Sequence, residues 1–376
     1  MREWKSTALP LLALGGVFWI AGCATASRGP IVLNLDRELR ARGLDPATVV
    51  NPFALTDEMR AWAHEQVPPG TPVEARLDRL LAALLDPARL RIEYEARATG
   101  TAIEVFQTRR ANCLAFTSLF VGMAREVGVP AIYLDIDDIE HFEKEGDLVV
   151  VSGHVSAGFS TGHSLKILDF SLAPAAEYRR VEPISDLTAI ALFHSNRGAE
   201  GLRRGRTDEA LDWLRKAVAI DPDLGGAWIN YGVALRRSGD ARGAEAAYRK
   251  ALEADPNALS AYQNLSALLR LQGQTMEADE LLALSSRLGS RNPFIYLTLG
   301  DLSLANGRME EARRFYQRAL RLYRGNAEPY AAMGQAALAQ GETGDALRWL
   351  KKALAIDQEN PRVKQLAQRL GGRRAA

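Results

Sequence analysis

The chain contains Cys113, His154 and Asp169, the three residue types that make up a thiol catalytic site. A thiol nucleophile needs a base within hydrogen-bond reach, and the base needs a third group to orient it. By itself a cysteine is also common as a small buried apolar residue. The prediction of a thiol site therefore depends on whether the fold brings these three residues together.

Cys113 falls in the first turn of a predicted helix. Apolar residues recur at helical spacing between Phe116 and Val127, and they form one apolar face. Asn112 is a good N-cap, while Gly128 and the proline that follows at position 130 end the helix. The positive end of the helix macrodipole would favour the Cys113 thiolate over the thiol.

After this helix the apolar period changes to that of strands. Alternating or β-branched apolar residues indicate half-buried strands, and a turn-like composition separates the last two segments. Helices followed by an antiparallel sheet predict an α+β domain. The segments are 132–136, 148–151, 154–159 and 165–170, with the turn at 160–164.

The last two of these segments predict a hairpin. If its centre lies between Thr161 and Gly162, residues whose numbers sum to 323 face each other, and His154 faces Asp169. Their Cβ atoms would be roughly 5 Å apart, close enough for the carboxylate to hold the imidazole. A bulged turn would shift this register by one residue and break the match. The other histidines lack both a strand context and a facing aspartate; they are His64, His141, His163 and His194.

The sequence Asn-Cys-Leu-Ala-Phe-Thr-Ser-Leu-Phe at 112–120, followed by Gly-Val-Pro at 128–130, resembles the nucleophile helix of the transglutaminase-like superfamily. The resemblance covers about residues 45–185. It implies a papain-like fold in which Cys113 attacks an acyl carbon, His154 shuttles the proton and Asp169 fixes the imidazole tautomer. Many members have glycine before this motif, where Ala111 stands here.

Gln107 precedes Cys113 by six residues. Papain-like proteases use a glutamine at similar spacing to stabilise the oxyanion, beside the main-chain N–H of the cysteine. Gln107 is therefore a candidate oxyanion residue. The alternative is an ordinary polar residue at a helix end.

The N-terminus resembles a bacterial lipoprotein signal. A positively charged start and an apolar run, too short to span a bilayer, precede Ile-Ala-Gly-Cys at 20–23. The resemblance implies a signal peptide at 1–22, lipidation of Cys23 and a tether at 23–45. The alternative is a plain signal peptide with an incidental cysteine. Ala24, where an aspartate would indicate the inner membrane, suggests the periplasmic face of the outer membrane within the cell envelope.

The cysteine count, the net charge and the spacing of acidic residues limit which ligands we expect the mature chain to bind. There are two cysteines, so lipidation of Cys23 would leave Cys113 as the single free thiol of an exported protein. A formal net charge of +1 gives no argument for nucleic acid. We expect no cofactor and no metal. The carboxylates at 135, 137, 138 and 140 favour a solvated acidic turn over a Ca²⁺ site, because they lack EF-hand spacing.

The second half of the chain repeats every 34 residues. Small residues, alanines and aromatic residues recur at this spacing, and the pattern resembles five tetratricopeptide repeats over 187–358, following a domain at 46–186. Residues 359–376 are predicted as a capping helix and tail. The third repeat is atypical because it has serine at 266, where the other repeats have glycine, and serine at 285, where they have alanine.

Asn196, Asn230 and Asn264 occupy one position of successive repeats. Some repeat arrays use such an asparagine ladder to bind the backbone of an extended peptide, so these residues are candidate peptide ligands; a local structural role is equally open. Arginines at 236, 237 and 270 would make the groove basic, or form a solvated face.

These patterns lead us to expect an exported, lipid-anchored enzyme. Its activity would be that of a thiol hydrolase or acyltransferase acting on protein or peptide amides, with the repeats recruiting a protein or peptide. The alternative is a scaffold lipoprotein of the cell envelope whose transglutaminase-like domain is inactive.

Overall fold

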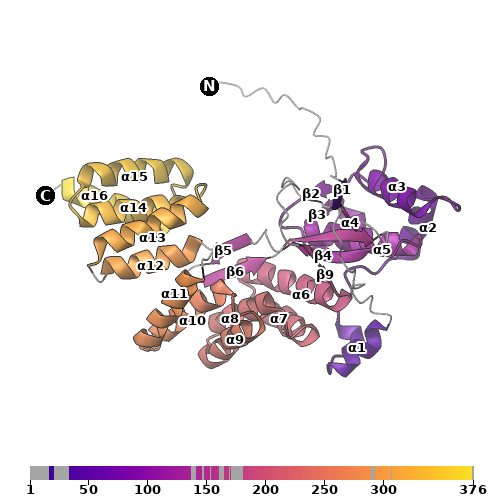
Figure 1. Ribbon diagram of the computed structural model, residues 1–376, viewed down its shortest axis with the longest axis horizontal. Helices are drawn as coiled ribbons and strands as arrows, with labels where there is room; N and C mark the ends of the chain where they lie inside the picture. The colour runs from indigo at the N-terminus through magenta and orange to yellow at the C-terminus, as the bar shows by residue number, and fades with distance from the viewer. Residues whose placement is uncertain are drawn as a thin grey trace, which may run out of the picture. The chain divides into compact units, whose positions relative to one another are not determined.

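The computed structural model describes residues 17–20, 34–136, 141–145, 148–152, 154–160, 165–168, 170, 181–288, 293–305 and 307–374 (Figure 1). The chain divides into two compact units. One comprises Met1–His141 and Ser152–Pro222, and the other comprises Phe142–Val151 and Asp223–Ala376.

The first unit combines helices with an antiparallel sheet, so the predicted α+β class is confirmed. Its helices are α1 (Leu35–Ala41), the 3-10 turn η1 (Pro46–Thr48), α2 (Asp57–Gln66), α3 (Val73–Leu85), α4 (Ala102–Thr108), α5 (Cys113–Glu126), α6 (Asp186–Arg203) and α7 (Thr207–Ile220).

The main sheet has the strand order β1-β8-β7-β4-β9, and every described neighbour pair is antiparallel. Its strands are β1 (Val17–Ile20), β4 (Ile132–Ile136), β7 (Val155–Ser160), β8 (Leu165–Leu168) and β9 (Val181–Ile184). Two small sheets pair β2 (Glu93–Tyr94) with β3 (Arg110–Ala111), in parallel, and β5 (His141–Glu145) with β6 (Leu148–Ser152).

Strand β1 comes from the segment that we predicted to lie outside the fold as a signal peptide. Its apolar sequence Val-Phe-Trp-Ile suits a strand, and it pairs with β8 from Val17 opposite Leu168 to Ile20 opposite Leu165. Without this segment, β8 would be the edge of the sheet.

The register of the β7–β8 hairpin differs from our prediction. Ala157 lies opposite Leu168 and Ser160 opposite Leu165, so paired numbers sum to 325 instead of 323. The described strands are separated by residues 161–164, which moves the centre of the hairpin one residue towards the C-terminus. Positions 154 and 169 sum to 323, so the register of the described pairs does not place them directly opposite each other as we predicted. Because the shift is an even number of residues, the predicted assignment of positions to the faces of the sheet is retained.

Helix α5 is the central element of the first core. Every residue from Leu114 to Ala124 is buried, because the sheet and the helices α2, α3 and α4 pack around it (Figure 1). Gly122 permits this closeness, since a Cβ atom there would come within 2.6 Å of the Phe53 carbonyl oxygen. Gly128 ends the helix as predicted, with a φ of +77° that favours glycine.

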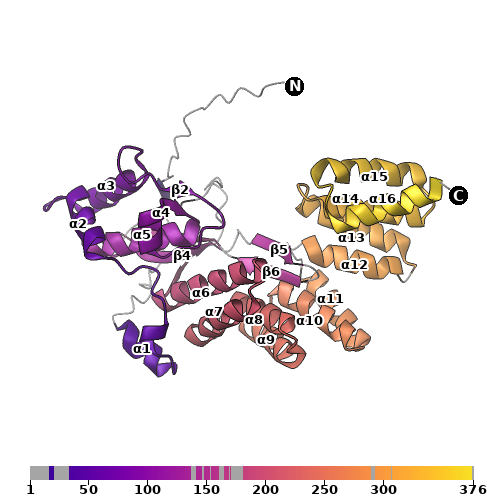
Figure 2. The ribbon, with the colours of Figure 1, turned by 180° about the vertical axis from the view of Figure 1, so that it is seen from behind.

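The repeats form consecutive helix pairs, of which α6 and α7 belong to the first unit (Figure 2). The helices of the second unit are α8 (Gly225–Arg237), α9 (Ala241–Ala254), α10 (Leu259–Leu271), α11 (Thr275–Arg287), α12 (Pro293–Ala305), α13 (Met309–Leu322), α14 (Ala327–Ala339), α15 (Thr343–Ile356) and α16 (Pro361–Arg374).

Small residues at the repeated glycine position let paired helices approach. A Cβ at Gly232 would come within 2.4 Å of the Tyr248 ring, and one at Gly300 within 2.3 Å of the Tyr316 ring. Ser266 takes this position in the atypical third repeat, where its hydroxyl donates to the Ala278 carbonyl oxygen at 2.8 Å.

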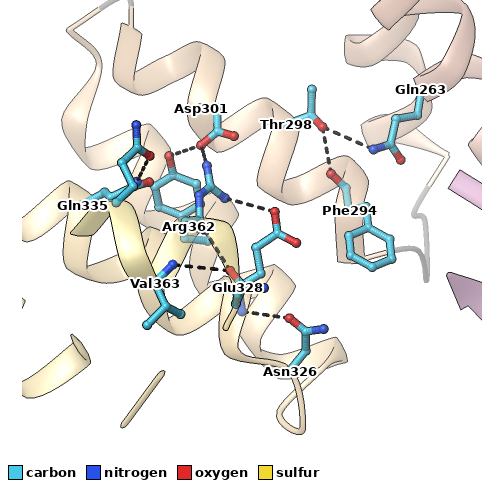
Figure 3. Close-up of polar contacts among 12 residues, drawn as sticks. Gln263, Phe294, Thr298, Asp301, Asn326, Glu328, Gln335, Arg362 and Val363 are labelled. Carbon is cyan, nitrogen blue, oxygen red and sulfur yellow. Dashed lines mark hydrogen bonds and ion pairs between the residues drawn. The ribbon is translucent and has the colours of Figure 1, made fainter. Parts of the chain in front are cut away.

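Helix α16 covers the end of the array through both apolar and charged contacts. Its own residues Val363, Leu366 and Leu370 are buried in the core of the array. Arg362 forms ion pairs with Asp301 on α12 and with Glu328 on α14, as Figure 3 shows. Among the described residues, no helix is both long enough and apolar enough to cross a bilayer.

Candidate thiol active site

Cys113 is the first residue of α5 and is partly exposed. The residue before it, Asn112, caps the helix as predicted, because its side-chain oxygen accepts a hydrogen bond from the Ala115 amide at 2.9 Å. The first turn of a helix carries main-chain N–H groups without partners inside the helix, and these point towards its N-terminus. Cys113 therefore lies where N–H donors and the macrodipole both favour negative charge.

His154 immediately precedes β7 and is 3% exposed. Its main-chain carbonyl accepts a hydrogen bond from the Ile136 amide at 3.0 Å, which fixes its backbone beside β4. A contact between α5 and β7 then relates it to the thiol. The Thr117 hydroxyl, one turn after Cys113, donates to the carbonyl of Val155 at 3.3 Å. Cys113 lies one helical turn before Thr117, and His154 lies one residue before Val155. Both residues are therefore close along the chain to the hydrogen bond that joins α5 to β7.

An aromatic group covers α5 near its N-terminal end. The Phe170 ring stacks on Phe116 with centroids 4.0 Å apart, and the ring of Tyr94 lies 5.8 Å from Phe170. Asp169, the residue predicted to orient the imidazole, lies outside the described residues. The residue that follows it in sequence, Phe170, is thus in contact with the helix that begins at Cys113.

The segment before Cys113 is held by β2. The Glu93 amide donates to the Arg109 carbonyl at 2.8 Å, and Ala111 lies opposite Tyr94 in the parallel pair. Ala111 is fully buried, so its methyl group, where many relatives have glycine, lies inside the core. Gln107 is exposed near the end of α4, and its role at an oxyanion stays a prediction.

The structure describes no cluster of three or more histidine, cysteine, aspartate or glutamate side chains that would hold a metal ion, within the residues that it covers. Of the acidic positions weighed for Ca²⁺, Asp135 lies in β4, whereas Asp137, Asp138 and Glu140 lie outside the described residues.

Comparison with known families agrees with both halves of this architecture. The transglutaminase-like superfamily matches residues 60–135, and the tetratricopeptide repeat matches residues 202–269 and 295–370. The chain carries a transglutaminase-like domain followed by tetratricopeptide repeats. The first match contains Cys113 and ends before His154. No curated protein matches the chain.

Solved structures that resemble the chain are repeat proteins or their complexes. Pseudomonas aeruginosa pilF is 26% identical with a TM-score of 0.42, over 48% of this chain and 82% of that chain. A thermophilic tetratricopeptide-repeat protein of Thermus thermophilus is 21% identical with a TM-score of 0.40, over 48% and 97%. For a chain of the Cut9–Hcn1 hetero-tetramer the values are 23% and 0.41, over 46% of this chain, which spans 35% of that chain.

The transglutaminase-like domain is fastened to α6, the first helix of the tetratricopeptide repeats. At the C-terminal end of α5, the Arg125 guanidinium makes two hydrogen bonds to the Asp186 carboxylate, at 2.9 and 2.8 Å, and its Nε donates to the Ala131 carbonyl. The Asp186 side chain is 5% exposed. This buried ion pair joins the last turn of the nucleophile helix to the first turn of α6.

Near the other end of α5, the contacts with α6 run through Thr99, which our sequence reasoning missed. Arg197 and Glu200 of α6 both bind its main chain, and its hydroxyl binds Asn112. A sequence signal for this contact exists in the 34-residue period. The positions equivalent to Arg197 and Glu200 are apolar in the other repeats: Tyr231, Leu265, Leu299 and Met333 for the first, and Ala234, Leu268, Leu302 and Ala336 for the second.

His194 on α6 occupies the aromatic position of the repeats and is fully buried. Its Nδ1 lies 2.9 Å from the Ile190 carbonyl oxygen, and its ring centroid lies 5.1 Å from that of Trp213. Burial, helped by the nearby Lys216 ammonium, lowers the pKa of His194 to about 4. His194 is thus a neutral packing residue, consistent with the choice of His154 as the base.

The predicted asparagine ladder lies largely inside the repeats. Asn230 and Asn264 are fully buried, and Asn196 is partly exposed. Side chains with no exposed surface suit packing between helices better than contact with a peptide, and the peptide-binding role stays a prediction. Arg270 forms an ion pair with Asp279, so its charge is already balanced. Cys23 lies outside the described residues.

Proposed function

We propose that the protein is a thiol-dependent hydrolase or acyltransferase that acts on protein or peptide amides. The observation that carries this proposal is the placement of a partly exposed Cys113 on the first turn of α5, with His154 beside a strand residue that α5 contacts one turn later. The match of residues 60–135 to the transglutaminase-like superfamily supports it.

In the proposed reaction, the Cys113 thiolate attacks the amide carbon and a C–S bond forms. The carbon–nitrogen bond then breaks, and protonated His154 gives its proton to the leaving amine. Water or a second amine then attacks the resulting thioester, and His154 takes a proton from the attacking molecule. The carbon–sulfur bond breaks and the Cys113 thiolate leaves. Asp169 orients the imidazole, and Gln107 with the N–H groups at the start of α5 binds the oxyanion.

Tetratricopeptide repeats generally bind protein partners. We infer that the repeats of this chain recruit the substrate or a partner protein to the transglutaminase-like domain. The lipobox-like sequence that ends at Cys23 supports anchoring by lipid in the cell envelope, at the periplasmic face of the outer membrane.

Labelling of the thiol tests the catalytic part. In a Cys23→Ser background, Cys113 is the single cysteine, so a thiol-reactive acyl or alkyl probe reports on it alone. We expect folded protein to label faster than the same chain in urea, and His154→Ala to remove the difference. His64→Ala is the matched control, because His64 is exposed and pairs with Glu126 on the protein surface.

The second candidate function is a scaffold with an inactive transglutaminase-like domain. One observation favours it: the buried methyl group of Ala111 stands where many members have glycine just before the cysteine motif. A Cys113 that reacts no faster in the folded protein than in urea would contradict the enzyme and support the scaffold.

A further inference from the structure

The amide, the carbonyl and the hydroxyl oxygen of Thr99 each form a hydrogen bond. Its amide donates to Glu200 Oε1 at 3.1 Å, and its carbonyl oxygen accepts from Arg197 Nη1 at 3.1 Å. Its hydroxyl oxygen accepts from Asn112 Nδ2 at 2.9 Å. Thr99 and Glu200 are each 5% exposed, so these bonds are shielded from competing water.

The Asn112 side chain therefore has two neighbours with different roles. Its nitrogen donates to Thr99, and its oxygen accepts from the Ala115 amide in the first turn of α5. The main-chain amide of Asn112 also donates to the Ala98 carbonyl at 3.0 Å. An N-cap side chain held at its far end keeps a single orientation, and that orientation determines the direction of the first turn, where Cys113 lies.

The residues that hold Thr99 are specific to the first repeat. Positions equivalent to Arg197 and Glu200 carry no charge in the four later repeats, and six of these eight residues are buried. Glu200 is buried whereas Arg197 is partly exposed, and a buried charge is costly unless hydrogen bonds satisfy it, so Glu200 indicates a role beyond the packing of helices. Arg197 also lies over the Trp213 ring of α7, 5.5 Å from its centroid, so both helices of the repeat fix its position.

We propose that Glu200 and Arg197 of the first tetratricopeptide repeat are positioning residues for Cys113. They act through Thr99 and Asn112, so the first repeat contributes to the position of the Cys113 thiol. The inference rests on the proposed function for the role of Cys113, but the ordering of α5 by α6 is measured independently of that role.

The test compares variants of the full chain in the Cys23→Ser background. Glu200→Leu introduces the residue found in two later repeats and removes the acceptor for the Thr99 amide. Glu200→Gln keeps a side-chain oxygen that accepts this bond. Thr99→Val keeps both main-chain bonds to α6 and removes only the link to Asn112. Glu209→Ala is the matched control, since it removes an exposed glutamate that pairs with Arg206 in the same repeat.

Two measurements are made on each variant: amide hydrogen exchange in the first turn of α5, and the rate of Cys113 alkylation by iodoacetamide at pH 7 relative to unfolded chain. We expect Glu200→Leu and Thr99→Val each to speed exchange at Ala115 roughly fivefold, the loss typical of a helix cap, and to slow alkylation by a similar factor. Glu200→Gln and Glu209→Ala should resemble the parent. Combining Glu200→Leu with Thr99→Val should add little, because both changes break one pathway.

Unchanged exchange and alkylation in both Glu200→Leu and Thr99→Val would overturn the inference. So would a Glu200→Leu effect that persists in full on top of Thr99→Val. If Glu200→Leu does not fold, Arg197→Met, which removes the donor to the Thr99 carbonyl, takes its place in both comparisons. Failure of the proposed function gives a different result: Cys113 of the parent then alkylates no faster than in unfolded chain, whereas the exchange measurement still tests the ordering of α5.

Discussion

The buried histidine of the first repeat predicts a measurable loss of stability in acid. His194 is neutral in the folded chain because burial lowers its pKa to about 4, from an ordinary value of 6.5. Its Nε2 is buried and has no hydrogen-bond partner among the described residues, so a proton placed there would be an unpaired buried donor. The unfolded chain has no such constraint and takes up this proton below pH 6.5.

The sign and size follow from proton linkage. Between pH 6.5 and 4 the unfolded state binds more protons at this site than the folded state, so stability falls as the pH falls. One pKa unit corresponds to about 1.4 kcal/mol. His194 should therefore lower the free energy of unfolding by about 2 kcal/mol at pH 5, and by about 3 kcal/mol at pH 4. Above pH 7 it should contribute no pH dependence.

The variant His194→Phe provides the comparison, because it keeps an aromatic ring beside Trp213 but cannot be protonated. Protection of the α6 amides against hydrogen exchange, corrected for the intrinsic effect of pH, measures the stability of this region between pH 7.5 and 5. We expect the parent protein to lose about 2 kcal/mol more than the variant. Other titrating groups are common to both proteins and cancel. Equal pH dependence in the two proteins would show that His194 is protonated in the folded chain and refute the reasoning.

The remaining predictions concern packing and anchoring. Arg125→Met leaves a buried carboxylate without its partner and should cost about 3–5 kcal/mol in urea unfolding; a loss below about 1 kcal/mol would contradict this. Gly300→Ala places a methyl group against the fully buried Tyr316 ring and should cost about 1–3 kcal/mol, whereas Gly226→Ala, at a helical position with open space, should be neutral or stabilising. Cys23→Ser should release the protein from membranes; retention after a high-salt wash would argue against a lipid anchor.

Local patterns in the sequence predicted the nucleophile helix well. The N-cap at Asn112 and the glycine end at Gly128 are both present in α5, because these features depend only on residues within one turn of the helix ends. The 34-residue period likewise predicted the helix pairs, since each repeat is a unit of local contacts with its neighbours.

The hairpin shows where local patterns stop being sufficient. Composition indicated two strands and a turn. The exact register depends on the conformation of the turn, and a turn of this composition can adopt several conformations that give different registers. The observed register differs from the predicted one by two residues, and an even difference leaves each position on the predicted face of the sheet.

The sequence by itself indicated candidate residues for thiol chemistry, where the helix that begins at Cys113 starts and that a repeat array follows. Only the tertiary structure showed that the first repeat belongs to the same compact unit as Cys113, and that Glu200 holds Thr99, 101 positions earlier in the chain. The residues adjacent to Glu200 and to Thr99 do not encode a contact between positions so far apart in the chain. Its sole sign in the sequence is a charge at a position that is apolar in every later repeat, and a charge there does not identify its partner, because the path of the chain brings the two together.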